Sequence, residues 1–350
     1  MNIVVLCGGL SFERDVSLCT GSLVLKALLN RGHNAILADV IGDIDVPDKN
    51  YKRYIETCHQ RAQKVYSVPK IAPDLEKMRK EVLKKGNGVF GKNVLNLCMA
   101  ADIVFMALHG EDGEDGKIQA ALDLMNVKYT GAGYLGSAVA MSKKYTKQIF
   151  LVNDILSPEY VMLKKDEYDE SMLDNIKLPC VVKLNSGGSS IGVYIVKENE
   201  ELKDCVNEAF ELEDELVVEQ YIEGQEYTCG VFADEGLPVV EITPNDGFYD
   251  YEHKYQPGRT KEICPAPSLS KEKTKEMQEI SVKAHKALSL EVYSRVDFIM
   301  DDKGDLYCLE ANTLPGMTPT SLLPQEAEAA GISYEEFCVK IIEESLLKYK

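Results

Sequence analysis

Short apolar runs that alternate with helical segments are the feature that most limits how this chain can fold. The run "NIVVLCGG" ends in glycines, a helix-like segment follows at 16–31, and "NAILADV" then has the composition of another strand. "ADIVFMALHG" is a further buried strand, and the segment after it has the pattern of a helix and a short strand. Because strands joined by helices run parallel, this half predicts an α/β domain with a mostly parallel sheet.

The rest of the chain predicts a second α/β unit and then a strand-rich unit. One helix is expected from Leu135 to about Asp154, and short strands then alternate with charged helical stretches. After Glu219 the pattern is strand-rich, with a helix at about 270–290 and the strands "SRVDFIM" and "LYCLEAN" beyond it. Segment 43–93 is polar, rich in lysine and weakly periodic, which predicts an insertion on the surface.

The composition is that of a folded protein that handles small molecules. The 350 residues are 45% hydrophobic and 27% charged, which is ordinary for a globular chain, and the length predicts two or three packed units. The formal net charge of -18 would repel nucleic acids and anionic membranes, and no block rich in lysine and arginine offsets it. We therefore expect neither a nucleic acid nor a membrane as partner.

The N-terminus and the cysteines predict a cytoplasmic protein. The first apolar run is far too short for a signal peptide, and no later segment reaches the length of a membrane span. The 10 cysteines are scattered, without a CxxC pair or a Cys/His cluster. We expect buried thiols in a reducing compartment rather than disulfides or zinc ligands.

The stretch "KLNSGGSSIGVYIV", which begins at Lys183 between two strand-like runs, has two interpretations. Glycine and serine form turns, so the stretch could simply join two strands. Alternatively, such a loop can direct several backbone N–H groups at a phosphate while the lysine neutralises its charge. Taken by itself, the stretch leaves both interpretations open.

Two strands near the C-terminus bring hard oxygen ligands together. If "SRVDFIM" and "LYCLEAN" pair across a turn at 302–304, Asp297 and Glu310 lie near each other across the pair. Glu310 and Asn312 are two residues apart and therefore share a face. Two carboxylates and an amide are a set that magnesium takes when it also binds nucleotide phosphates. A solvated polar hairpin face is the alternative, and we favour the metal site.

Two loops at the carboxyl ends of expected strands predict a substrate crevice. "GGLSFERDVS" lies between a strand and a helix but lacks the G-x-G-x-x-G spacing, so a nicotinamide cofactor is poorly supported. Within this loop, Glu13 could cap the helix. In the second loop, "LHGEDGEDG", His109 is either a hydrogen-bonded loop residue or a catalytic group. Two loops at one sheet edge form a crevice there.

The strand end in "VVEQYIEGQEY" predicts contacts with a nucleoside. Backbone groups at such an end can read an adenine edge, and a carboxylate such as Glu226 can accept from ribose hydroxyls. The residues at the strand end are Glu219, Gln220, Tyr221 and Ile222.

Seven stretches resemble, in order and over nearly the whole chain, signatures of the D-alanine–D-alanine ligases of the ATP-grasp superfamily. They are "GGLSFERDVSL", "ALHGEDGEDG", "YTGAG", "KLNSGGSSIG", "FYDYEHKY", "SRVDF" and "LEANTLPGMTPTSL". The resemblance implies an α/β and α+β enzyme that joins two D-alanines for peptidoglycan precursor synthesis and releases ADP and phosphate from ATP. It also implies three domains: an N-terminal parallel-sheet domain at 1–140, a central ATP-grasp subdomain at 141–217, and a C-terminal subdomain at 218–350 with a closing loop at 245–266.

The same resemblance implies roles for individual residues. ATP would be bound by Lys143, Lys183, Ser186, Ser190, Glu219, Gln220, Tyr221, Ile222 and Glu226. Two magnesium or manganese ions would be held by Asp297, Glu310 and Asn312. The first D-alanine would meet Glu13, which forms a triad with Ser189 and Tyr255, and would lie near His109. Arg295 and the Gly316 N–H would stabilise an oxyanion, Ser321 and Leu322 would receive the second substrate, and Lys254 would bind a substrate group.

These residue types suit ligation through an acyl phosphate. A carboxylate is a poor electrophile, so ATP first phosphorylates it, and metal and lysine charge offset the phosphate oxygens. The second amine then attacks, and an arginine with a backbone N–H suits the tetrahedral oxyanion. Because an acyl phosphate hydrolyses in water, a long closing loop is expected.

Two residues depart from the family pattern, and three other functions are alternatives to the D-alanine–D-alanine ligase. Leu184 stands where the family usually has proline, and Gly187 where many members have glutamate, although neither change removes an essential charge. A D-alanine–D-lactate ligase, a D-alanine–D-serine ligase or an inactive nucleotide-binding paralogue are the alternatives. The retained lysines and metal ligands argue against the inactive paralogue. Tyr255 is neutral between pH 5 and 8, so we expect D-alanyl-D-alanine as the main product. The resemblance further suggests a homodimer.

Overall fold

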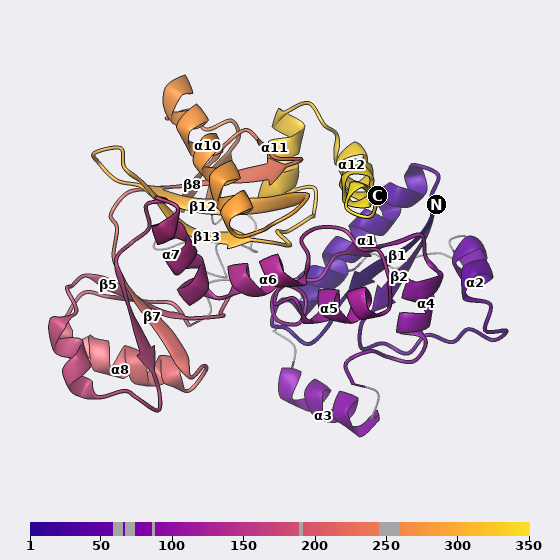
Figure 1. The fold of residues 1–350 in the computed structure, drawn as a ribbon, viewed down its shortest axis with the longest axis horizontal. Coiled ribbons are helices and arrows are strands. Elements are labelled where there is room, and N and C mark those ends of the chain that lie inside the picture. The colour runs from indigo at the N-terminus through magenta and orange to yellow at the C-terminus, as the bar shows by residue number, and fades with distance from the viewer. Residues whose placement is uncertain (59–65, 67–73, 86–87, 189–191, 245–259) are drawn as a thin grey trace.

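The protein is described here by a computed structural model. It describes residues 1–58, 66, 74–85, 88–188, 192–244 and 260–350. Figure 1 shows three groups of elements, each built around a sheet of its own.

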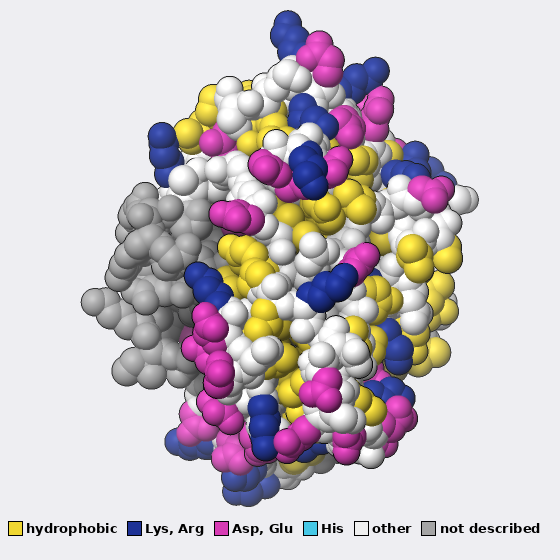
Figure 2. Space-filling model, turned by 90° about the vertical axis from the view of Figure 1, so that its left-hand side faces the viewer, with side chains coloured by type: hydrophobic (Ala, Val, Ile, Leu, Met, Phe, Trp, Pro, Cys, Tyr) yellow, Lys and Arg dark blue, Asp and Glu magenta, His cyan; other side chains and the backbone are white. Residues whose placement is uncertain are grey.

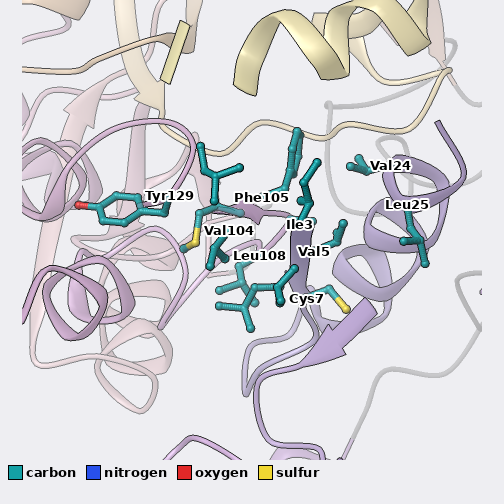
Figure 3. Packing of buried hydrophobic residues seen from close by; sticks show 14 of the residues in the cluster. Ile3, Val5, Cys7, Val24, Leu25, Val104, Phe105, Leu108 and Tyr129 are labelled. Carbon is teal, nitrogen blue, oxygen red and sulfur yellow. The ribbon is translucent and has the colours of Figure 1, made fainter. Parts of the chain in front are cut away.

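The N-terminal sheet confirms the predicted parallel arrangement. Its strands are β1 (Asn2–Cys7), β2 (Asn34–Asp39) and β3 (Ile103–Met106), in the order β2-β1-β3, and both pairings are parallel. Helix α1 (Arg14–Asn30) joins β1 to β2. Apolar side chains of β1, β3 and α1 pack together in the core, as Figure 3 shows. All three strands end toward the same edge, where the two predicted loops begin.

Segment 43–93 is more than a surface insertion. It holds α2 (Tyr51–Cys58) and α3 (Leu75–Lys85), and α4 (Val94–Ala100) follows it. Helix α2 packs on β1, β2 and α4, and Ile55 in α2 is fully buried. This part of the segment therefore contributes to the N-terminal core.

The single helix expected from Leu135 to about Asp154 is wrong. After α5 (Lys117–Leu124), the chain forms α6 (Tyr134–Met141) and then a separate α7 (Lys143–Val152). Ser142 separates them because its backbone is extended and its side chain caps α7 by accepting from the Tyr145 N–H.

The central sheet is antiparallel and covered by one helix. Strand β7 extends past the expected end of the central unit at 217, and the sheet order is β4-β7-β5-β6. Helix α8 packs against β5, β6 and β7. The elements are β4 (Tyr160–Lys164), the 3-10 helix η1 (Glu170–Asn175), β5 (Cys180–Leu184), β6 (Tyr194–Val196), α8 (Asn199–Phe210) and β7 (Glu215–Gln220).

The C-terminal sheet is also antiparallel. Its order is β11-β10-β8-β12-β13, with β9 paired to β8. The strands are β8 (Gln225–Phe232), β9 (Glu235–Gly236), β10 (Val240–Pro244), β11 (Thr260–Ile263), β12 (Tyr293–Met300) and β13 (Leu306–Asn312). The helices are α10 (Lys271–Ala287), α11 (Leu322–Ala329) and α12 (Tyr334–Leu347).

The last helix joins the first unit to the C-terminal unit. Figure 1 shows α12 beside α1, and the two helices pack together. Phe337 and Ile341 of α12 are fully buried in the same core cluster as β1 and β3. Within the described part of the chain, no helix combines the length and the apolar character that a membrane crossing requires.

Candidate active site

The predicted metal ligands lie together on the β12–β13 hairpin. Asp297 and Glu310 are cross-strand partners, which confirms the predicted register. The Asn312 amide donates to Asp297 Oδ2 over 2.9 Å. Among the described residues, no group of three or more His, Cys, Asp or Glu side chains is placed to hold a metal ion. The hairpin itself offers two carboxylates and one amide. This hard-oxygen donor set fits magnesium or manganese beside phosphate.

Asp297 is surrounded by hydrogen-bond donors. Arg295 donates to it from Nε and Nη2, each over 2.9 Å. Thr228 on β8 donates its hydroxyl to Asp297 Oδ1 over 2.6 Å. Arg295, the predicted oxyanion group, thus lies beside Asp297 on β12 and opposite Asn312 on β13.

Two lysines from different elements lie close to this hairpin. Lys143 at the start of α7 donates to the Gly187 carbonyl over 2.6 Å, and its Nζ is 3.4 Å from Glu310 Oε2. Lys183 on β5 donates to Glu219 Oε2 over 2.8 Å. Burial opposes the charge on Lys183, but the Glu219 carboxylate outweighs it and raises the pKa of the ammonium above its ordinary value. The lysines can therefore offset phosphate charge at one place.

A third lysine, which the sequence did not single out, completes this cluster. Lys147 Nζ lies 3.2 Å from Glu219 Oε1. Its burial lowers its pKa, and Glu219 only partly offsets the effect. Lys143 and Lys147 are four residues apart on α7, which places them on one face. That spacing is the signal that could have pointed to Lys147.

The residues expected to bind the nucleoside mostly make contacts within the protein. The Glu219 side chain is 2% exposed and both its oxygens face lysines. The backbone N–H of Gln220 donates to Glu159 O, and that of Tyr221 donates to Pro179 O. Ile222 is buried, and Glu226 lies on β8 opposite Ile242 and Ile299. The expected role of residues 219–222 in holding adenine stays a prediction.

Glu13 lies in the first of the two loops that were expected to form a crevice, and its side chain lies close to the second. It occupies the N-cap position of α1, but its side chain makes no capping hydrogen bond, so the capping alternative is wrong. A β-carbon at Gly110 would lie 2.8 Å from Glu13 Oε2, and one at Gly188 would lie 3.6 Å from it. These residues line a cavity of about 300 Å³ with Ser11, Phe12, Glu111, Met141, Leu184, Ser186, Gly187, Glu211, Leu212 and Glu213. The first loop thus meets the glycine-serine loop.

His109 is a buried, hydrogen-bonded residue. Its Nε2 lies 2.9 Å from Thr20 Oγ1, and its Nδ1 lies 2.9 Å from the Leu314 carbonyl. Burial lowers its pKa below the ordinary value, which favours the neutral ring. It links α1 to the loop that follows β13, and direct contact with substrate stays a prediction.

Glu114 is a second residue that sequence reasoning missed. It accepts from the backbone N–H of Gly110 and of Leu314, over 2.9 and 3.1 Å. Burial, together with the charge of Glu13, raises its pKa to about 8. It lies in the "HGEDGEDG" loop, where several acidic residues gave no reason to choose one of them.

The residues expected near the second substrate form a compact turn. A β-carbon at Gly316 would lie 2.8 Å from Ser321 Oγ, so this glycine permits a close approach. Ser321 Oγ accepts from the Thr318 N–H over 3.1 Å. Leu322 begins α11 and its side chain is buried.

Part of the expected site lies outside the described residues. This applies to Ser189, Ser190, Lys254 and Tyr255, and to most of the 245–266 loop. Ser186 is described, and its backbone N–H and hydroxyl both donate to Glu213.

Two family models match most of the chain. Residues 2–132 match the model described as D-ala D-ala ligase N-terminus, and residues 150–343 match D-ala D-ala ligase C-terminus. The chain belongs to the D-alanine–D-alanine ligase family. Among its ligase relatives, the D-alanine–D-alanine ligase of Pediococcus pentosaceus is 43% identical over 98% of this chain and 97% of that protein. The one from Halalkalibacterium halodurans is 40% identical over 99% of this chain and all of that protein (100%).

Solved ligase structures share the ATP-grasp fold of this chain. The Bacillus anthracis D-alanine–D-alanine ligase complexed with ATP has a TM-score of 0.74 and 32% identity, and covers 99% of this chain and 97% of its own. The Coxiella burnetii ligase has a TM-score of 0.75 and 27% identity, with 99% and 94% covered. These likenesses confirm the predicted fold class and the predicted family.

The two departures from the ligase pattern are linked by packing. A β-carbon at Gly187 would lie 2.7 Å from Leu184 Cβ, and one at Gly192 would lie 2.7 Å from Leu184 Cγ. The leucine side chain therefore occupies the space that side chains at both positions would need. Leucine at 184 and glycine at 187 suit each other.

Proposed function

We propose that this chain joins two D-alanines to D-alanyl-D-alanine, a peptidoglycan precursor, with conversion of ATP to ADP and phosphate. One observation carries the proposal: Lys143 lies 3.4 Å from Glu310, on the hairpin that also carries Asp297 and Asn312, and the charge of the same Glu310 acts on Lys183. The Bacillus anthracis relative with 32% identity was solved as a complex with ATP, which supports ATP as the nucleotide.

Each group has a task in the first step. Glu13 would hold the ammonium of the first D-alanine, whose carboxylate attacks the γ-phosphorus while ADP leaves. Lys143 and Lys183 would neutralise phosphate oxygens. Asp297, Glu310 and Asn312 would hold two Mg²⁺ or Mn²⁺ ions, which supply positive charge to the phosphate oxygens when bound.

The second step joins the two substrates. The amine of the second D-alanine, after losing a proton, attacks the acyl phosphate carbonyl, and phosphate leaves as the amide forms. Arg295 and the Gly316 N–H would stabilise the oxyanion. Ser321 and Leu322 would bound the second substrate, and the 245–266 loop would exclude water.

The cysteines support a proposed location in the cytoplasm. All 10 cysteines are free thiols, which suits a reducing compartment such as the cytoplasm. On the face in Figure 2, basic and acidic side chains lie interspersed, as on a solvated surface. We propose a homodimer, which light scattering at several concentrations would test.

The decisive experiment follows phosphate release from ATP and separates the products. The enzyme receives equal D-alanine and D-lactate near pH 6 and near pH 8, with L-alanine as control substrate. We expect mainly D-alanyl-D-alanine at both pH values and no turnover with L-alanine. Glu310→Gln should abolish turnover with the fold intact. Predominant depsipeptide, or ATP turnover without an amino acid, would contradict the assignment.

A further inference from the structure

Lys147 is a buried cation to which the proposed reaction assigns no task. Its side chain is 1% exposed, which excludes contact with a bound nucleotide. Its Nζ donates to Ser157 Oγ over 2.9 Å and to the Pro158 carbonyl over 3.3 Å. It also lies 5.3 Å from the centre of the Tyr160 ring. Because a buried ammonium is costly without partners, this enclosure fixes its position.

Glu219 connects this buried lysine to the nucleotide site. Tyr160 and Glu219 are cross-strand partners on β4 and β7, so Lys147 is held against one such pair. Glu219 Oε2 accepts from Lys183 over 2.8 Å, and Oε1 lies 3.2 Å from Lys147 Nζ. Burial alone would raise the pKa of Glu219, but the two lysines lower it below its ordinary value. One carboxylate is thus shared by two ammonium groups.

The charge balance depends on the third member. A buried pair of Lys183 and Glu219 would be neutral and would attract phosphate weakly. With Lys147, the three groups carry a net positive charge. The charge of Glu310 also acts on Lys183, but Lys143 lies 3.4 Å from Glu310 and offsets it.

We propose that Lys147 is a positioning residue of the nucleotide site: it holds Glu219 in place and offsets its charge, so that Lys183 keeps its attraction for ATP phosphates. This inference rests on the proposed ATP-dependent function. Lys143 and Lys147 then act from one face of α7: Lys143 contacts Gly187 in the glycine-serine loop, and Lys147 holds Glu219.

Lys147→Met tests the proposal because methionine is unbranched like lysine and lacks the charge. We expect the Kd of ATP, and that of ADP, to rise about tenfold or more. The Kd of adenosine should change less than about twofold, since it carries no phosphate. Titration calorimetry, with adenosine measured by competition, gives all three values.

Four further variants make the test specific. Lys147→Arg keeps the charge and should keep ATP affinity within about threefold. In Lys147→Met/Glu219→Gln the carboxylate is neutral too, so the ratio of ATP to adenosine affinity should return toward that of the wild type. Lys203→Met is the matched control in the same unit, because Lys203 pairs with Glu170 at an exposed site. Lys147→Gln, which keeps an N–H donor, takes the place of Lys147→Met if the latter does not fold.

The outcomes separate this inference from the proposed function. Unchanged ATP affinity, or equal losses for ATP and adenosine, would overturn the role of Lys147. A wild type that binds ATP but forms no dipeptide would overturn the ligase function, while the binding series would still decide on Lys147. A wild type that binds no ATP would overturn both.

Discussion

At the scale of single residues, the site's carboxylates differ in what surrounds them. Asp297 accepts hydrogen bonds from Arg295, Asn312 and Thr228. Glu114 is enclosed near another carboxylate, and burial there raises its pKa to about 8. The same functional group is therefore a proposed metal ligand in one place and a buried support that holds a proton more tightly in another.

Glu114 should make stability depend on pH. Its pKa is about 8 in the folded protein and 4.5 ordinarily, so the folded state binds the proton more tightly. Its contribution is therefore complete below pH 4.5 and is lost as pH rises through about 8. Glu114→Gln should flatten this decline in the free energy of unfolding, measured by denaturant titration from pH 5 to 9.

The control for this prediction lies in the same loop. Glu111 is about half exposed and pairs with Arg79, so Glu111→Gln should keep the wild-type pH profile. Glu114→Gln loses one acceptor for the Gly110 or Leu314 N–H, so only the slope is diagnostic. Identical slopes in Glu114→Gln and the wild type would contradict the prediction.

At the scale of elements, the break between α6 and α7 positions Lys143, one of the lysines proposed to bind phosphate. The Lys143 N–H donates to the Asn185 carbonyl, and the Lys144 N–H donates to Asn185 Oδ1. Ser142 donates its hydroxyl to the same Oδ1 over 3.2 Å. The first turn of α7 is thus attached to the residue that directly follows β5, the strand of Lys183. In a continuous helix, the backbone N–H groups of Lys143 and Lys144 would bond to carbonyls of the preceding turn and would not reach Asn185.

Ser142→Ala should lower the free energy of unfolding by about 1 kcal/mol, because it removes the cap of α7 and the bond to Asn185. Since the start of α7 carries Lys143, KM for ATP should also rise. Denaturant unfolding and initial rates at varied ATP measure the two effects. Ser142→Asp keeps a capping oxygen and should lose less stability; equal stability of alanine variant and wild type would refute the role of the cap.

At the scale of the whole molecule, the C-terminus closes the first domain. Tyr129 pairs with Val104 of β3 through an isolated parallel bridge. On its other side, the Tyr129 N–H donates to the Tyr349 hydroxyl over 3.0 Å, and that hydroxyl donates to the Tyr129 carbonyl over 3.2 Å. Lys348 Nζ also lies 4.8 Å from the centre of the Tyr129 ring. Lys348 and Tyr349 therefore pack against the residue that extends the N-terminal sheet beside β3.

Tyr349→Phe should lower the free energy of unfolding by about 1–2 kcal/mol, because both backbone groups of Tyr129 lose their partner. Amide hydrogen exchange at β3 should become faster, because this exchange reports unfolding of the N-terminal sheet. Lys340→Met removes only an exposed pair with Glu336 and should change stability by less than about 0.5 kcal/mol. Unchanged exchange at β3 in Tyr349→Phe would contradict the closing role of the C-terminus.

The sequence by itself determined the family and several of the elements. The parallel β1–β3 sheet and the pairing of Asp297 with Glu310 could be predicted, because strand alternation and a short turn are local properties. The ligase motifs, each a short stretch, were sufficient to name the family that the comparisons then confirmed.

Only the tertiary structure decided which side chains meet. The helical periodicity of the sequence continues through Ser142. In the structure, Ser142 has an extended backbone, caps α7 and donates to Asn185, so one helix ends before it and another begins after it. Lys147 and Glu114 differ from other charged residues only by their burial and their neighbours, which come from distant parts of the chain. Local patterns carry no record of such contacts, because packing of separate elements creates them.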